Sequence, residues 1–257
     1  MDQKRLLIAL VGVGAFAAPL AVTAAIKVTI DRRREKRRRT GLEEVGIRMG
    51  LRYEREPQPQ RQDESEWFLF GWTEGPARNI LRGAAAGTEV VIFDSNIRGY
   101  QNRTLSRTVA AYRLHSSVPE FELWRGVGIR KLLGSRALGF IEGVHHINFD
   151  GNQDFSDRYV VRGLVEDEHA IRAFFNPEML EYFVSLDRNN NYRVATGDGW
   201  IGFCKWEKMP KPEAVPAFLD ETSAMYSAIK SHMSGSAVAE GVFGSNRSNA
   251  TICLRDV

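Results

Sequence analysis

The chain has 257 residues, 43% of them hydrophobic, so it can bury a core and is not a chain disordered throughout. Its formal net charge of +3 is unevenly distributed: through Arg39 there are ten basic and three acidic residues, a net of +7, which leaves −4 for the remainder. A mildly acidic body behind a basic N-terminal region does not indicate a nucleic-acid-binding domain.

The first predicted element is a transmembrane helix. The segment from Leu6 to Ile26 has no charged residue over 21 positions. A helix of that length rises by about 30 Å, the thickness of a hydrocarbon core, so residues 1–30 are predicted to form a membrane anchor. A cleaved signal peptide is the alternative, because Lys4 and Arg5 precede the apolar run. The basic residues that follow the run are instead typical of a stop-transfer signal.

A basic juxtamembrane segment is predicted over residues 31–39. Its cationic residues are Arg32, Arg33, Arg34, Lys36, Arg37, Arg38 and Arg39. By the positive-inside bias, they place the protein in the cell membrane as a single-pass protein, with its N-terminus outside and its C-terminal domain in the cytoplasm. They are also expected to rest on anionic headgroups of the lipid bilayer, at about 1 kcal/mol each. RNA is an alternative polyanion, but no aromatic residue interleaves the run, so no specific nucleic acid is expected.

Residues 40–233 are predicted to form a cytoplasmic α+β domain with a mainly antiparallel sheet and packed helices. A short helix is expected to begin at a capping box of Thr40 and Glu43, and residues 56–66 form a polar loop. The strand-length runs are 66–72, 78–87, 88–96 and 104–115. The last three predict an antiparallel meander, whose middle strand is covered on both sides because both of its faces are apolar.

Further elements are predicted along the rest of the chain. Residues 124–143 are expected to form a helix on the sheet, with a membrane-surface amphipathic segment as the alternative. The next elements are a strand at 158–163, helices at 166–175 and 176–186, and a hairpin at 189–206 that turns at residues 197–199. A last helix opens at Pro212 or Pro216 and buries a stripe formed by Phe218, Thr222, Met225, Tyr226, Ile229 and Met233. Residues 234–257 are predicted to be a disordered tail.

The densest group of metal-binding residue types lies at 145–158. The candidate ligands are His145, His146 and Asp150, with Asp154 and Asp157 nearby. Adjacent histidines in an extended chain point to opposite sides, so only one could face a given ion. The alternative is a tight turn around Gly151 that leads into the next strand. No metal and no cofactor is therefore assigned, and these residues stay candidates.

Other reactive groups carry little catalytic signal. There is no G-x-S-x-G elbow, and no catalytic residue is assigned. Cys204 lies in a strand pattern and is expected to be a buried packing residue, while a pairing with Cys253 is left open. Arg158 and Arg162 could bind a phosphate or carboxylate, although such arginines more often pair with nearby acids.

Two segments carry a resemblance to a known family. The sequence RNILRGAAAGTEVVIFD at 78–94 fits the pattern R..LRG...G..V..FD, and residues 155–186 fit F...Y.VRG.......F.P.....L. Over residues 40–206 the chain therefore resembles a family of uncharacterised bacterial single-pass membrane-anchored proteins. The resemblance implies this architecture and a bacterial membrane, and it brings no catalytic residues. His145 and His146 depart from the family pattern, which counts against an essential metal.

The predicted function is a membrane-anchored interaction or scaffolding module that binds a membrane or cytoplasmic protein partner. The alternative is a ligand-binding or metal-dependent hydrolase domain with its site near residues 145–158.

Overall fold

The computed structural model describes residues 3–55, 77–98, 104–126, 144–187, 191–205 and 209–235. Within these ranges, side chains are described from Ile26 onward, except at 97–98, 104–105, 144 and 234–235. The described residues form one nine-stranded antiparallel sheet with helices, which confirms the predicted α+β class.

The element bounds are as follows. The strands are β1 Arg52–Glu54, β2 Arg78–Ala85, β3 Thr88–Arg98, β4 Thr104–Arg113, β5 Phe121–Arg125, β6 Val144–Ile147, β7 Tyr159–Leu164, β8 Tyr192–Gly197 and β9 Trp200–Lys205. The helices are α1 Gln3–Met49, α3 Gln153–Arg158, α4 Glu168–Phe174, α5 Pro177–Ser185 and α6 Val215–Gly235, with short 3-10 turns η3 Val165–Asp167 and η4 Pro212–Ala214.

The strands lie in the order β1-β2-β3-β4-β9-β8-β5-β7-β6, with antiparallel neighbours throughout. The predicted meander is β2-β3-β4, and β3 is covered on both sides as expected. Val90 and Ile92 belong to one buried cluster, whereas Val91 and Phe93 belong to another. Alternation of side chains along the strand sends these pairs to opposite faces of the sheet.

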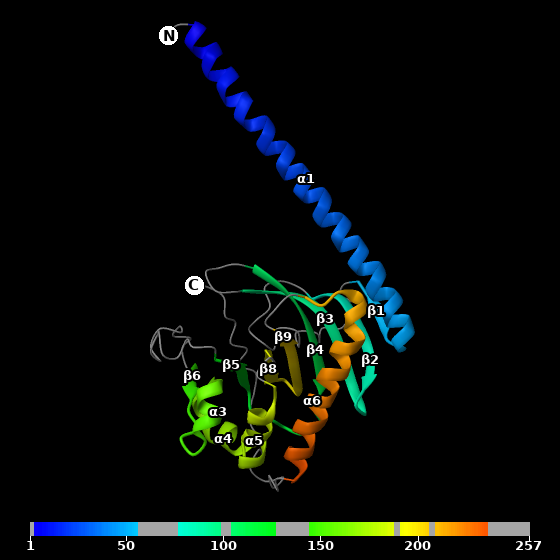
Figure 1. The fold of residues 1–257 in the computed structure, drawn as a ribbon, viewed down its shortest axis with the longest axis vertical. Helices are drawn as coiled ribbons and strands as arrows, with labels where there is room; N and C mark the ends of the chain where they lie inside the picture. Colours follow the sequence, from blue (N-terminus) through cyan, green and yellow to red (C-terminus); the bar gives the residue numbers. More distant parts are fainter. Residues whose placement is uncertain are drawn as a thin grey trace.

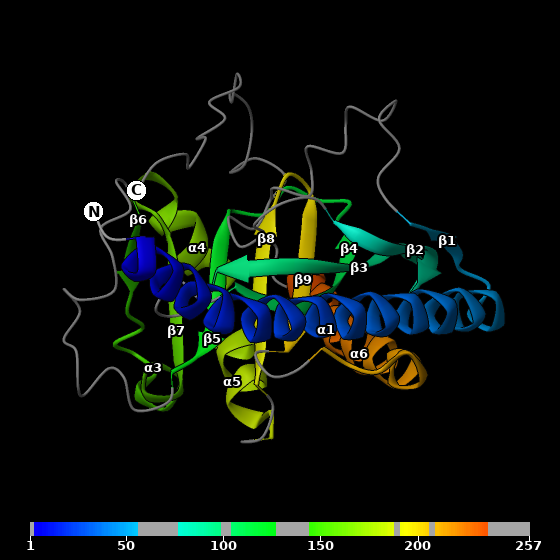
Figure 2. The same cartoon turned by 90° about the horizontal axis from the view of Figure 1, so that it is seen from above.

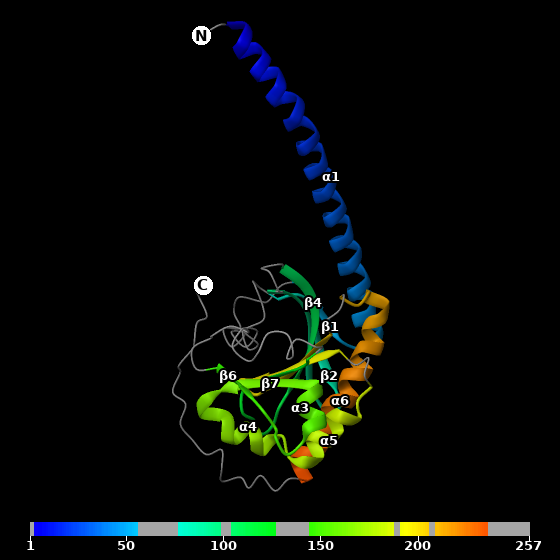
Figure 3. The ribbon, with the colours of Figure 1, turned by 60° about the vertical axis from the view of Figure 1, so that its left-hand side comes forward.

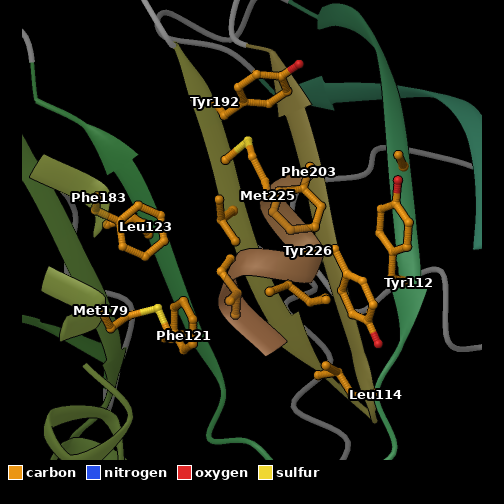
Figure 4. Close-up of a cluster of buried hydrophobic side chains, with 14 of the residues drawn as sticks. Tyr112, Leu114, Phe121, Leu123, Met179, Phe183, Tyr192, Phe203, Met225 and Tyr226 are labelled. Atoms are coloured by element: carbon orange, nitrogen blue, oxygen red, sulfur yellow. The ribbon is translucent and has the colours of Figure 1, made fainter. Parts of the chain in front are cut away.

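The main core lies between one face of the sheet and the helices. The C-terminal part of α1 lies beside α6 on this face (Figures 2 and 3). Figure 4 shows the aromatic centre of the core, where the Tyr112 ring of β4 stacks on Tyr226 of α6 with centroids 4.8 Å apart. The opposite face carries a smaller buried cluster that includes Phe93, Trp200 and Cys204. The sheet therefore separates two apolar layers.

Several predicted elements are confirmed. Asn176 caps α5 by accepting a hydrogen bond from the Met179 amide, and Pro177 is the first helical residue. The β8–β9 hairpin turns at Asp198 and Gly199, whose φ values are 45° and 78°. Positive φ at both central residues is the geometry that matches the twist of a two-residue hairpin. Five residues of the predicted α6 stripe are buried: Phe218, Thr222, Met225, Tyr226 and Ile229.

Helix α1 differs from the prediction. The expected short helix with a cap at Thr40 does not exist as a separate element, because Thr40 lies inside a continuous helix of 47 residues. Figure 1 shows that α1 extends from the body and that only its last part lies against the sheet. The capping-box spacing was misleading, since Thr and Glu three residues apart also fit a helix interior.

Among the side chains that the structure describes, no helix is long and apolar enough to cross a membrane. The predicted span from Leu6 to Ile26 lies within α1 by its backbone, but its side chains before Ile26 fall outside the described residues. The transmembrane assignment therefore stays a prediction.

Three strands were missed, and some predictions cannot be compared. Strands β1 and β5 were not predicted, and β6 contains His145 and His146, which were considered as metal ligands but not assigned to a strand. The turn before β7 contains the short helix α3, whose N-cap is Asn152. The predicted helix at 124–143 begins inside β5, which ends at Arg125, and the predicted tail at 234–257 begins inside α6, which ends at Gly235. The predictions for 56–66, 66–72, 127–143 and 236–257 lie outside the described residues.

Candidate functional site

The basic segment forms part of α1 and divides into two groups. Arg32, Arg33, Arg34, Lys36 and Arg37 are exposed, whereas Arg38 and Arg39 are partly buried. Successive residues turn by about 100° around a helix axis, so Lys36, two positions before Arg38, lies on the opposite side of α1. Lys36 therefore faces solvent, while Arg38 faces the body.

Arg38 makes a forked ion pair with Asp94 of β3. Its Nε and Nη2 atoms each lie 2.6 Å from a carboxylate oxygen, and Nη1 donates to the Pro210 carbonyl at 2.6 Å. Thr108 of β4 completes the pair, because its hydroxyl accepts from Arg38 and donates to Asp94. The side chains of Arg38 and Asp94 are only 9% and 4% exposed. Removing one partner of such a buried pair costs about 3–5 kcal/mol, because the other charge is left buried.

A bulge in β2 adds a further polar residue to this ion pair. The register shifts between Arg78 and Leu81, and Asn79 takes a φ of 53°, the left-handed conformation that Asn tolerates better than most residues. The Asn79 amide donates to Asp94 at 3.1 Å and to Glu35 of α1 at 2.9 Å. The bulge thus places the Asn79 side chain within hydrogen-bonding distance of both α1 and β3.

Tyr53 of β1 completes the network by donating to the Asn79 side-chain oxygen at 2.9 Å. Burial raises the pKa of Tyr53 to about 12, against a smaller opposing effect of Arg39. The phenol therefore stays protonated and keeps donating at neutral pH. We call these six residues the α1 joint: Glu35, Arg38, Tyr53, Asn79, Asp94 and Thr108.

After the α1 joint, the remaining turns of α1 contact the body through apolar side chains. Leu42 and Val45, one and two turns after Arg38, are 2% and 1% exposed within the main core. Gly41 allows close approach to η4, because a Cβ atom there would lie 2.8 Å from Pro212. The last part of α1 is therefore a component of the core.

The predicted metal ligands are separated in space. His145 Nε2 lies 2.7 Å from Glu168 Oε2, and Arg172 holds the other oxygen of Glu168 with Nη2 at 2.6 Å. The hydrogen bonds from Arg172 and then His145 hold the pKa of Glu168 below its usual value. His145 is thus part of a hydrogen-bonded chain between β6 and α4.

His146 and Asp150 go elsewhere. The His146 ring lies edge-on to Trp124 of β5, with centroids 6.2 Å apart, and Asp150 is exposed in the turn after β6. The opposite directions of His145 and His146 agree with the alternation expected of a strand. In the part of the chain that the structure describes, no group of three His, Cys, Asp or Glu side chains could hold a metal ion.

Arg158 and Arg162, which were considered as an anion-binding pair, are also separated. Arg162 lies 2.7 Å from Glu122 of β5, which also contacts Arg193 at 3.0 Å. Both guanidinium groups lie near the Trp124 ring, at 5.4 and 5.8 Å from its centroid. Arg158 instead donates to the Val184 carbonyl at 2.8 Å. Arg162 therefore meets an acid, as arginines usually do, but one from a strand that was not predicted.

The sequence held one signal for the special position of Arg38. Arg38, Leu42 and Val45 have the i, i+4, i+7 spacing of one helix face, which places Arg38 on the buried side. Its partners are 56 and 70 residues away, and Asn79 enters only through a bulge. No local pattern indicates those three residues.

Comparisons with known proteins place few limits on the function. No protein-family model matches the chain, and no curated protein matches it. Among solved structures, the crystal structure of the mycobacterial trehalose monomycolate transport factor A, TtfA, has 14% sequence identity and a TM-score of 0.48. The match covers 76% of this chain and 93% of that chain. A likeness this distant carries no argument about what this chain does.

Proposed function

We propose that the chain is a membrane-anchored interaction module of the bacterial single-pass type that the sequence resembles. In this proposal the residues from Leu6 to Ile26 cross the bilayer, and the body lies in the cytoplasm on the side of the basic segment. The observation that supports it is the continuity of α1 from the apolar segment, through the basic residues, into the core of the body. Because the helix is uninterrupted, the apolar segment is continuous with a helix that packs in the core of the body.

The exposed cations give the module a second contact with the membrane. Residues 26–37 are exposed along α1, and they include Lys27, Arg32, Arg33, Arg34, Lys36 and Arg37. Each such residue near an anionic surface contributes about 1 kcal/mol, and the contribution falls off over a Debye length. Arg38 is not part of this set, because Asp94 neutralises it.

The body itself is proposed to bind a membrane or cytoplasmic protein. The residues of the alternative hydrolase site contact different partners: His145 contacts Glu168, and His146 contacts Trp124. This separation is why the proposal places interaction ahead of catalysis, while the hydrolase alternative stays an untested prediction.

Carbonate extraction of membranes tests the anchor. The full-length protein is expected to remain in the membrane pellet at alkaline pH, as an integral protein does. The double variant Phe16→Arg/Ala17→Arg is expected to move to the supernatant, because each arginine near the centre of a span costs about 2.5–3.5 kcal/mol.

Ile47→Arg is the matched control, because Ile47 lies on the same helix and is 76% exposed in the body. This variant is expected to stay in the pellet. Extraction of the unaltered protein by carbonate would refute the anchor.

A further inference from the structure

We propose that the α1 joint makes α1 and the β-sheet one rigid lever, so that tilt or rotation of the projecting part of α1 is transmitted to β3 and β4. The proposal goes beyond anchoring. A membrane anchor needs only to be connected to the body, and a flexible linker would be sufficient for that. It also holds whether or not the first part of α1 crosses a bilayer.

The geometry of the joint restrains α1 in more than one direction. The fork of Arg38 fixes the guanidinium plane against Asp94, since two parallel hydrogen bonds define an orientation that a single contact does not. The third guanidinium nitrogen, Nη1, binds the Pro210 carbonyl, which comes from the segment that leads into α6. A rotation of α1 about its axis would break all three bonds.

A second residue of α1 is held one turn earlier. Glu35 accepts from Asn79, whose conformation is set by the β2 bulge. Non-glycine residues at positive φ persist only where their surroundings hold them there, and Asn79 is held by bonds to α1, β1 and β3. Contacts at both Glu35 and Arg38 therefore resist tilt of α1 as well as rotation.

In some proteins, buried polar networks act on the specificity of an arrangement more than on stability. A buried ion pair gains little over well-packed apolar side chains, but its directional hydrogen bonds favour one arrangement of the two elements. Leu42 and Val45 alone would let α1 slide on the sheet, whereas the Arg38–Asp94 pair fixes its position and rotation. The α1 joint is suited to transmitting motion of α1 to the sheet, because it fixes both the position and the rotation of α1.

Spin-label distances test the lever in the full-length chain in detergent and in lipid nanodiscs. Labels are placed at Ile30→Cys, exposed on the projecting part of α1, and at Ala173→Cys, exposed on α4, in a Cys253→Ser background. Cys204 is buried and free, and the labelling stoichiometry shows whether it has reacted. The unaltered joint is expected to give one narrow distance distribution.

Asp94→Asn removes the carboxylate charge that pairs with Arg38, with little change in volume. The narrow peak is expected to be lost and replaced by a broad distribution. Glu89→Gln is the matched control, because it makes the same carboxylate-to-amide change on the same strand at a side chain that is 50% exposed. It is expected to keep the narrow peak.

A narrow peak in Asp94→Asn, or a broad distribution in the unaltered chain, would overturn the lever. Thermal unfolding by circular dichroism identifies a variant that fails to fold. If Asp94→Asn fails to fold, the same distance is measured in Arg38→Lys, in which lysine keeps the positive charge but cannot form the two parallel hydrogen bonds. A broader distance distribution in Arg38→Lys supports the lever, and an unchanged narrow peak refutes it. Failure of the anchor in carbonate extraction would leave this result intact, so the two proposals are tested separately.

Discussion

Arg37 and Arg38 are neighbours with the same side chain, and the fold gives them different environments. Arg37 is exposed on the side of α1 that faces solvent, whereas Arg38 is enclosed by β3, β4 and the Pro210 segment. The composition of residues 31–39 predicts one set of equivalent cations. Rotation around the helix axis separates Arg37 from Arg38, because Arg38 shares a face with Leu42 and Val45 and Arg37 does not.

Cys204 is the residue whose chemistry the fold changes most clearly. It is buried in the smaller core layer, and this burial raises the pKa of its thiol to about 11, although Arg193 and Arg107 act in the opposite direction. In a Cys253→Ser background, we expect the native protein to react far more slowly with a thiol reagent at pH 8 than the denatured protein. Rapid native reaction would contradict the burial.

The same shift gives a pH dependence of stability. The pKa of Cys204 in the folded chain lies above the ordinary value of 9.0, so its contribution is fully present below about pH 9 and is lost as the pH rises through about 11. Cys204→Ala should reduce the loss of stability over this window, as measured by denaturant unfolding at several pH values. An equal loss in both proteins would exclude Cys204 as a cause.

Residue-level predictions from the sequence succeed where the cause is local. Asn176 and Pro177 are correctly placed because a helix cap needs only the next three residues. The buried state of Cys204 is correctly predicted because the strand pattern around it is apolar. The partners of Arg38, His145 and Arg162 are not predicted, because each comes from an element distant in the chain.

At the scale of elements, α1 is held by its last turns. Leu42→Ala is expected to lower the free energy of unfolding of the body by about 2–5 kcal/mol, because it leaves a cavity in the main core. Ile47→Ala, on the same helix but 76% exposed, is expected to change it by less than about 0.5 kcal/mol. Chemical denaturation of both variants checks this difference, and equal effects would contradict the docking of α1.

The elements that were missed have a common physical reason. Strand β1 has only three residues, β5 has five, and β6 has four that include two histidines, so none of them shows a long apolar alternation. They are strands because β1 pairs with β2, and β5 and β6 both pair with β7. Pairing partners supply the stabilisation that local propensity lacks. The meander and the β8–β9 hairpin were predictable because their turns are short and their strands are apolar.

At the scale of the whole molecule, the chain combines a projecting helix with a body that encloses the end of that helix. The basic residues lie between the predicted span and the α1 joint, so about 16 Å of exposed helix separates Ile26 from Arg37. In the proposed membrane arrangement, this spacing holds the body near the bilayer surface without embedding it. Sequence length and charge predicted the order of these parts, but not that a single helix joins them.

Labelling of single cysteines from outside intact cells tests the orientation most directly. Asp2→Cys, at the proposed outer end, and Ala173→Cys, in the body, are compared in a Cys253→Ser background with a membrane-impermeant maleimide. We predict that Asp2→Cys is labelled in intact cells and that Ala173→Cys is labelled only after permeabilisation. Labelling of Ala173→Cys in intact cells, with Asp2→Cys protected, would contradict the proposed membrane arrangement.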